Sequence, residues 1–154
     1  MNRRSFLKLG SIFGGAALVP GKRPKPPVEP LTFSQVLTGT TKAVETINLL
    51  NERYTELVMP ESTLWQVDWK ILFDAVDAYH AGYWYGKGIL WRNHADNIMG
   101  QWEGPLFGYG YGNLARTVNC KMKPSGHVVH FQVTGLPEMT INWVASVDVV
   151  VCKQ

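Results

Sequence analysis

The sequence predicts an α+β domain in which two amphipathic helices pack on an antiparallel sheet formed by the C-terminal half. Between residues 33 and 83, apolar side chains recur at steps of three and four, the spacing of one helix face. From residue 116 onward they alternate with polar side chains, the spacing of a half-buried strand. No βαβ alternation and no internal repeat is found, so a parallel sheet or a repeat architecture is not expected.

The first predicted helix covers residues 33–58, with Thr32 and Gln35 as a capping box at its start and Pro60 at its end. Its apolar face consists of Phe33, Val36, Val44, Ile47, Leu50, Tyr54 and Val58. The second predicted helix follows Ser62 and buries an aromatic stripe. That stripe consists of Trp65, Trp69, Leu72, Val76, Tyr79 and Tyr83. Glycines then interrupt the pattern, and residues 86–112 are expected to form turns and short strands.

The C-terminal half predicts an antiparallel meander. A hairpin with a type I turn at residues 123–126 joins a strand with Cys120 on its inner face to a strand with Phe131 on its inner face. The last strand, residues 139–151, carries seven apolar residues on one face and mostly polar residues on the other. The two helices are expected to cover one face of this sheet.

Length and composition fit one globular domain with a tail. The chain has 154 residues, of which 45% are hydrophobic and 18% charged, and no window reaches the roughly 18 uninterrupted apolar residues of a membrane span. We divide it into an export signal or basic arm (1–20), a proline-rich linker (21–31) and a single α+β domain (32–154).

Charge is distributed unevenly along the chain. The first thirty residues contain six basic residues and one acidic residue, whereas the remainder has a net charge of −2. The body therefore offers no basic face for a phosphate backbone, and nucleic-acid binding is not expected of it.

The N-terminus has the layout of an export signal, with a basic start followed by a short, glycine-containing apolar run. The residues Arg3, Arg4, Phe6, Leu7 and Lys8 within it match the core of a twin-arginine (Tat) signal, which residues 2–20 resemble. The resemblance implies export of a folded chain to the periplasm or cell envelope, and no family is identified for the domain itself. No A-x-A cleavage site follows, so the segment can remain attached to the domain. If it is uncleaved, we expect membrane contact only through this segment.

The alternative for this segment is a basic arm that is retained inside an assembly, as in viral coat proteins. In that case residues 21–30 act as a semi-rigid proline-rich spacer. A retained arm and an exported protein predict different N-terminal residues in the mature protein.

The two cysteines form an even pair in a chain that is expected to be exported, which favours a disulfide between Cys120 and Cys152. Strand parity opposes it. Cys120 lies on the inner face of its strand, whereas Cys152 follows the inward Val151 and points outward unless a bulge intervenes. Both alternatives stay open.

The sequence favours a protein that is not an enzyme and needs no cofactor, since it lacks a nucleophile elbow, a zinc-protease motif, a P-loop and a C-x-x-C pair. His127 and His130 would lie on opposite faces of a strand, so they are not expected to share a metal. A metal-dependent enzyme remains an alternative only if two separate segments meet. Its candidate ligands are Asp77, His80, His94 and Asp96.

Aromatic residues are concentrated between residues 65 and 111, which contain twelve of the eighteen. Those outside the predicted helical stripe lie among glycines, with no clear inward face, so they either pack in the core or form an exposed binding surface. The candidate binding residues are Trp84, Trp91, Trp102, Tyr109 and Tyr111. Tyr109 and Tyr111 would point the same way on an extended segment.

Together these features predict an exported, non-catalytic envelope or assembly subunit that binds a protein partner or a glycan through this aromatic, glycine-rich surface. A virion or filament subunit that keeps its basic arm, and therefore self-assembles, is the second interpretation. A small metal-dependent extracytoplasmic enzyme is the third.

Overall fold

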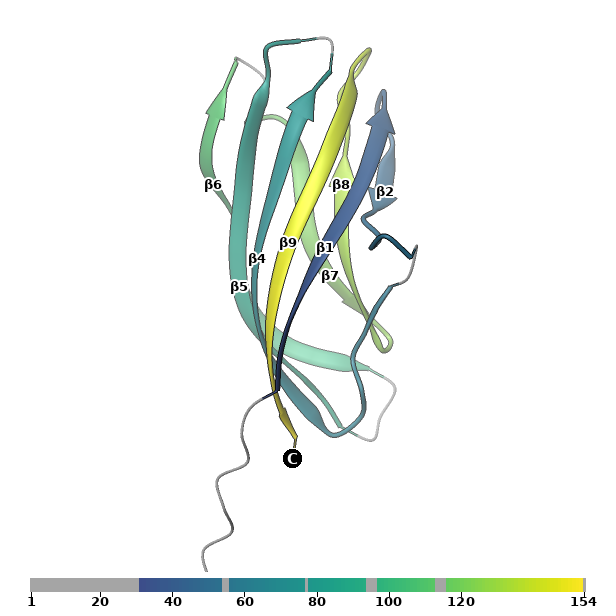
Figure 1. Cartoon of the computed structure of the whole chain (residues 1–154), viewed down its shortest axis with the longest axis vertical. Coiled ribbons are helices and arrows are strands. Elements are labelled where there is room, and N and C mark those ends of the chain that lie inside the picture. The colour runs from purple at the N-terminus through teal and green to yellow at the C-terminus, as the bar shows by residue number, and fades with distance from the viewer. Residues whose placement is uncertain (1–30, 54–55, 77, 94–96, 113–115, 154) are drawn as a thin grey trace, which may run out of the picture.

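The computed structural model describes residues 31–53, 56–76, 78–93, 97–112 and 116–153, and all regular structure in these ranges is β-strand (Figure 1). The predicted α+β class is therefore wrong. The strands are β1 (Leu31–Lys42), β2 (Thr46–Asn48), β3 (Leu57–Val58), β4 (Thr63–Ala75), β5 (Ala81–Arg92), β6 (Ile98–Tyr111), β7 (Asn119–Ser125), β8 (Val128–Thr134) and β9 (Thr140–Lys153).

The strands form two antiparallel sheets that pack face to face (Figure 1). The first has five strands in the order β1-β9-β4-β5-β6. The second is centred on β8, which pairs with β7 on one side and with the short β2 and β3 on the other. Two layers of sheet bury the apolar faces against each other without any helix in the described part of the chain.

The first predicted helix is replaced by β1, β2 and β3. In β1 the buried residues are Leu37 and Thr41, whereas Val36, assigned to the helical face, is 58% exposed. Four threonines lie between residues 31 and 42, and β-branched side chains favour strands. The capping box does not form, because Thr32 and Gln35 lie in β1 and pair with Val150 and Val147 of β9.

The second predicted helix is replaced by β4 and the start of β5. Strand β4 alternates strictly between buried and non-buried positions along its thirteen residues. Trp65 and Trp69 are buried as expected, but Leu72 lies on the other face and Tyr79, which follows β4, is 90% exposed. Residues 86–112 were expected to form short strands, yet most of them belong to the long, paired β5 and β6.

The hairpin prediction is confirmed, since β7 and β8 pair and bury Cys120 and Phe131 on their inner faces. Its turn lies further along than predicted: Ser125 pairs with Val128, and Gly126 has a positive φ of 59°. A glycine in that conformation is what a two-residue hairpin turn requires at its first position. The prediction for β9 is confirmed in its faces, but β9 joins the first sheet between β1 and β4, so the strands do not form a meander.

Large rings of β4 fill the interior. The Trp69 ring contacts that of Phe131 on β8, with centroids 5.9 Å apart, and the Phe73 ring lies 5.7 Å from that of Trp143 on β9. Opposite these rings, β5 presents glycines: Gly86 is the register partner of Trp69, and a methyl group at Gly86 would overlap the indole. The core therefore depends on a ring from one strand occupying the space above a glycine of the next.

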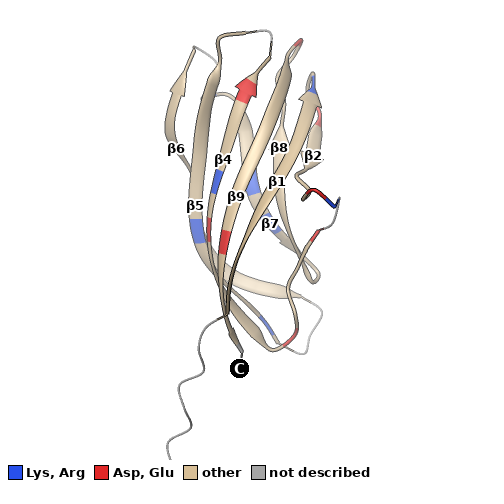
Figure 2. Cartoon of the chain, in the orientation of Figure 1, with Lys and Arg blue, Asp and Glu red and all other residues tan. Residues whose placement is uncertain are grey.

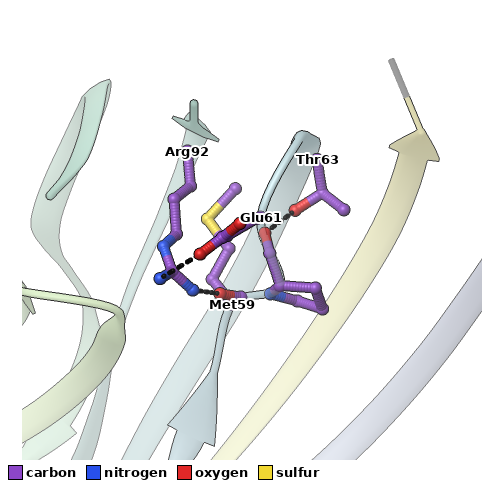
Figure 3. Close-up of polar contacts among 5 residues, drawn as sticks. Met59, Glu61, Thr63 and Arg92 are labelled. Carbon is purple, nitrogen blue, oxygen red and sulfur yellow. Dashed lines mark hydrogen bonds and ion pairs between the residues drawn. The ribbon is translucent and has the colours of Figure 1, made fainter. Parts of the chain in front are cut away.

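One end of the sandwich is fastened by Arg92, the last residue of β5 (Figure 3). Its Nη1 donates a buried hydrogen bond of 2.7 Å to the carbonyl oxygen of Met59, and its Nη2 lies 3.5 Å from Oε1 of Glu61. In the same connection Thr63 Oγ1 donates to the Pro60 carbonyl at 2.6 Å. These bonds hold the link between β3 and β4, and a charged donor to a buried carbonyl is worth more than a neutral one.

The two cysteines are free thiols, one inside the sandwich and one on its surface. Cys120 is buried on the inner face of β7, and Cys152 is exposed on the outer face of β9, as strand parity indicated. Burial raises the pKa of Cys120 to about 12, so its thiol stays protonated at neutral pH.

We expect Gly86→Ala to lower the free energy of unfolding by about 1–3 kcal/mol, because the new methyl group displaces the Trp69 ring. Thermal and urea unfolding would measure the change. The control is Lys87→Ala on the same strand, whose exposed side chain makes only a surface ion pair and whose removal should change stability by less than about 0.5 kcal/mol. Equal stability of Gly86→Ala and wild type would contradict this packing.

We expect a thiol reagent at pH 8 to modify Cys152 quickly and Cys120 only after unfolding. The thiolate is the reactive form, and burial keeps Cys120 almost entirely protonated at that pH. Mass spectrometry with and without reductant counts the modified thiols. An unfolded protein with no reactive thiol before reduction and two after it would instead show that the cysteines pair.

Candidate functional site

The outer face of the five-stranded sheet carries most of the candidate residues. Because inner and outer positions alternate and β5 pairs with β4 in continuous register, Tyr83, Tyr85 and Trp91 share the outer face with Leu72 of β4. The pairing of β5 with β6 brings Tyr109 opposite Tyr83 on this same face. We call the outer surface of β4, β5 and β6 the aromatic face.

A depression of about 640 Å³ lies at one end of the aromatic face, and we call it the tyrosine hollow. Tyr109 and Tyr111 line it with side chains that are 68% and 65% exposed, so both predicted residues lie on the same side of β6. Its remaining walls are Leu72, Phe73, Asp74, Ala81, Gly82, Tyr83, Asn142 and Val144. Two exposed rings therefore border a recess that also contains polar side chains.

The two polar side chains of the tyrosine hollow have hydrogen-bonding capacity left over. In the part of the chain that the structure describes, the Asp74 carboxylate has no hydrogen bond or ion pair. Asn142 Oδ1 accepts from Thr40 Oγ1 at 3.0 Å, and its amide nitrogen has no partner within the described ranges. The hollow can thus accept hydrogen bonds through Asp74 and donate them through Asn142.

The middle of the aromatic face is held by contacts around Tyr83. Lys70 Nζ lies 4.6 Å from the centroid of the Tyr83 ring, which also lies 6.4 Å from that of Tyr85. The same ring covers Gly108 of β6, where any side chain would collide with it. A cation over one ring face and a glycine beneath the ring fix Tyr83 in one orientation, so it forms a rigid wall of the hollow.

A second depression, of about 780 Å³, lies nearer the other end of the aromatic face, and we call it the tryptophan hollow. Trp91 lines it from the outer face, and Trp102, which occupies an inward position of β6, borders it at the open edge of the sheet, together with polar residues. Those residues are Gln66, Asp68, Lys87, Gln101 and Glu103. Lys87 Nζ lies 3.6 Å from Glu103 Oε2, and Gln66 Nε2 donates to Asp68 Oδ2 at 3.3 Å, so much of this polar surface is internally paired.

Two predicted binding residues lie on the inner side of the sheet. Trp84 is opposite Ile71, packs edge-on against Phe107 with centroids 5.0 Å apart, and belongs to the core rather than the surface. Trp102 is opposite the inward position of Gly88, although its indole is 43% exposed at the open edge. The inward position of Trp84 follows from the continuous pairing of β5 with β4, whereas that of Trp102 follows from β5–β6 pairing with register shifts near Tyr83 and Tyr85, for which the sequence shows no signal.

The histidines considered as metal ligands are not brought together among the described residues. His127 is exposed in the β7–β8 turn. His130 lies on β8, and its Nδ1 is 3.8 Å from Oε1 of Glu56. His80 comes just before β5, whereas Asp77, His94 and Asp96 lie outside the described residues. Within the described ranges, no three His, Cys, Asp or Glu side chains gather closely enough to hold a metal ion.

Charge on the five-stranded sheet is sparse and mixed (Figure 2). The aromatic face has three acids, Asp68, Asp74 and Glu103, and two bases, Lys70 and Lys87. Neither sign dominates, so this face does not attract a highly charged polymer. In the described ranges, nothing helical is long and apolar enough to cross a membrane.

Comparison with known proteins adds little. No protein-family model and no curated protein matches the chain. Among solved structures, one similar chain is the tailspike protein gp49 of Acinetobacter baumannii bacteriophage Fri1, described as a capsular polysaccharide depolymerase, with a TM-score of 0.37 and 12% identity. The match covers 80% of this chain and 20% of the tailspike chain, so this chain spans about a fifth of that protein's length. A TM-score this low does not establish a shared fold.

Proposed function

We propose that this protein is an exported, non-catalytic binding subunit that holds a glycan chain on its aromatic face. The observation that carries the proposal is the tyrosine hollow, where two largely exposed rings stand beside the Asp74 carboxylate, which has no partner among the described residues, and the amide of Asn142. Large rings at an exposed position are a recurrent feature of binding sites.

The chemistry of the tyrosine hollow matches that of a sugar ring. A pyranose has apolar C–H faces, which can lie flat on Tyr109 or Tyr111, and hydroxyl groups around its rim. Hydroxyls donate to a carboxylate such as Asp74 and accept from an amide such as Asn142. A few convergent polar groups beside apolar walls are typical of sites that bind and orient small polar ligands.

The distribution of charge favours a neutral glycan. The three acids and two bases of the aromatic face provide no excess positive charge for an acidic polysaccharide. The two hollows lie on one face along β5, and the twelve residues of that strand span roughly 40 Å. An extended chain therefore suits this face better than a single sugar.

Export rests on the N-terminal sequence. The twin-arginine-like motif at Arg3 and Arg4, followed by Phe6, Leu7 and Lys8, supports transport to the periplasm or cell envelope. The retained basic arm of a virion or filament subunit is the competing interpretation of the same residues.

We expect Tyr109→Ala to weaken glycan binding about tenfold or more, because losing a stacked ring removes on the order of 1.4 kcal/mol. Calorimetric titration with chitohexaose as a neutral probe and hexagalacturonate as an acidic probe would measure it. The neutral probe should bind wild-type protein more tightly, and the melting temperature of the variant should stay close to wild type because Tyr109 is 68% exposed.

Tyr79→Ala is the matched control, since Tyr79 is an exposed tyrosine that does not line the hollow. It should leave binding unchanged. Failure of wild-type protein to bind any member of a broad oligosaccharide array would refute the glycan assignment and favour a protein partner. Equal binding by Tyr109→Ala and wild type would place the site elsewhere.

For export, we expect the double variant Arg3→Lys, Arg4→Lys to accumulate in the cytoplasm, because a twin-arginine signal is defined by its arginine pair. Fractionation and N-terminal sequencing of the wild type and the variant would check this. The control is Lys22→Arg, Lys25→Arg in the linker, which should not change the compartment. A wild-type protein found in particles with Met1 or Asn2 at its terminus would support the retained arm instead.

A further inference from the structure

Strand β1 forms one edge of the five-stranded sheet and leaves part of its backbone unpaired. In an antiparallel edge strand, alternate residues direct both N–H and C=O toward the open side. Thr38 does so, since its N–H donates to the Leu50 carbonyl at 2.8 Å and its C=O accepts from the Leu50 N–H at 3.2 Å. Val36, Ser34 and Thr32 precede it at steps of two and therefore face the same way.

In the described part of the chain, no hydrogen bond reaches the backbone of these three residues from the open side. At one end of this open stretch the bridge from Thr38 to Leu50 covers the edge. Ser34 is the middle one of the three open residues, so the open stretch is symmetric about it.

The side chains of β1 along this stretch are uncharged and partly apolar. Glu52 and Arg53 of the following loop, one acid and one base, line a depression together with Ser34 and Val36. The first charged residue of β1 is Lys42, at its far end, while Leu31 and Val36 are 61% and 58% exposed. A depression of about 560 Å³ adjoins the stretch on its inner side, lined in part by Leu31 and Phe33. Unprotected edges of this kind pair readily with another strand.

The opposite edge of the same sheet is protected. Strand β6 contains Pro105 and shifts its register with β5 at two places. Bulges and proline are common means of preventing an edge from pairing. The two edges therefore differ, and only β1 presents a regular, uninterrupted backbone in this sheet.

We propose that two copies of this protein associate through β1, in an antiparallel pair centred on Ser34. In this arrangement Ser34 lies opposite Ser34 of the second copy, and Thr32 lies opposite Val36 of that copy. The same surface serves both copies, and no like charges meet along it. The two sheets become one, and the aromatic faces of both copies lie on the same side of it.

Crosslinking tests the register. Directly opposed, hydrogen-bonded residues of antiparallel strands have Cα atoms about 5.5 Å apart, which is within disulfide range. Ser34→Cys in a Cys152→Ser background should therefore form a disulfide-linked dimer under mild oxidation. Thr32→Cys in that background is the control, because its two copies would be offset by four residues, roughly 13 Å. Equal crosslinking of both variants, or of neither, would overturn the proposed register.

A second variant tests the edge itself. Val36→Pro removes an N–H that faces the open side, so it breaks no bond to β9, whereas Val36→Thr retains that N–H. Sedimentation of the full chain should show dimers for wild type and Val36→Thr and monomers for Val36→Pro, with circular dichroism confirming that Val36→Pro is folded. A wild-type protein that is monomeric at every concentration, or a folded Val36→Pro dimer, would refute the proposal. Glycan binding by a monomer would leave the proposed function intact.

Discussion

The packing of Trp69 above Gly86 is the contact on which both the core and the aromatic face depend. Strand β4 directs large rings inward, and β5 accommodates them because its inward positions include Gly82, Gly86 and Gly88. The inward positions of β5 also include Trp84 and Leu90, which pack with the core. Its outward positions carry Tyr83, Tyr85, Ile89 and Trp91, so the same strand admits the rings of β4 through its glycines and supplies the aromatic surface on the outside.

Strand β9 explains why the two edges of the sheet differ. It lies between β1 and β4, pairs along its whole length with both, and holds β1 through the 2.9 Å hydrogen bond from Trp143 Nε1 to Thr41 Oγ1. That pairing keeps β1 in register over twelve residues. At the other edge β6 has only β5 as a neighbour in the sheet and departs from regular pairing near Gly104 and Gly108. A strand supported along its full length remains a regular template, while a bulged strand does not.

The C-terminal strands could be predicted from the sequence because one face of each is polar, which makes a period of two unambiguous. The N-terminal strands could not, since a spacing of four, as between Trp65 and Trp69, fits both a helix and a strand. Val67, Ile71 and Phe73 distinguish a strand from a helix here. In a helix they would lie around its circumference, whereas in a strand they lie on the same face as Trp65 and Trp69. In β5 and β6, glycines at inward positions erase the hydrophobic pattern. The shared face of Tyr109 and Tyr111 was predictable from parity alone, but the inward placement of Trp84 depends on pairing that no local pattern reveals.

The two ends of the sandwich are not equivalent. Leu31 at the start of β1 pairs with Val151 near the end of β9, so the chain enters and leaves the fold at one end (Figure 1). The tyrosine hollow lies at the other end, beside Asp74 and Asn142, and β4 separates the two ends by roughly 40 Å. If the molecule is attached through its N-terminus to a lipid bilayer or to a scaffold, this hollow lies at the end of the domain far from the attachment point, where a ligand can reach it.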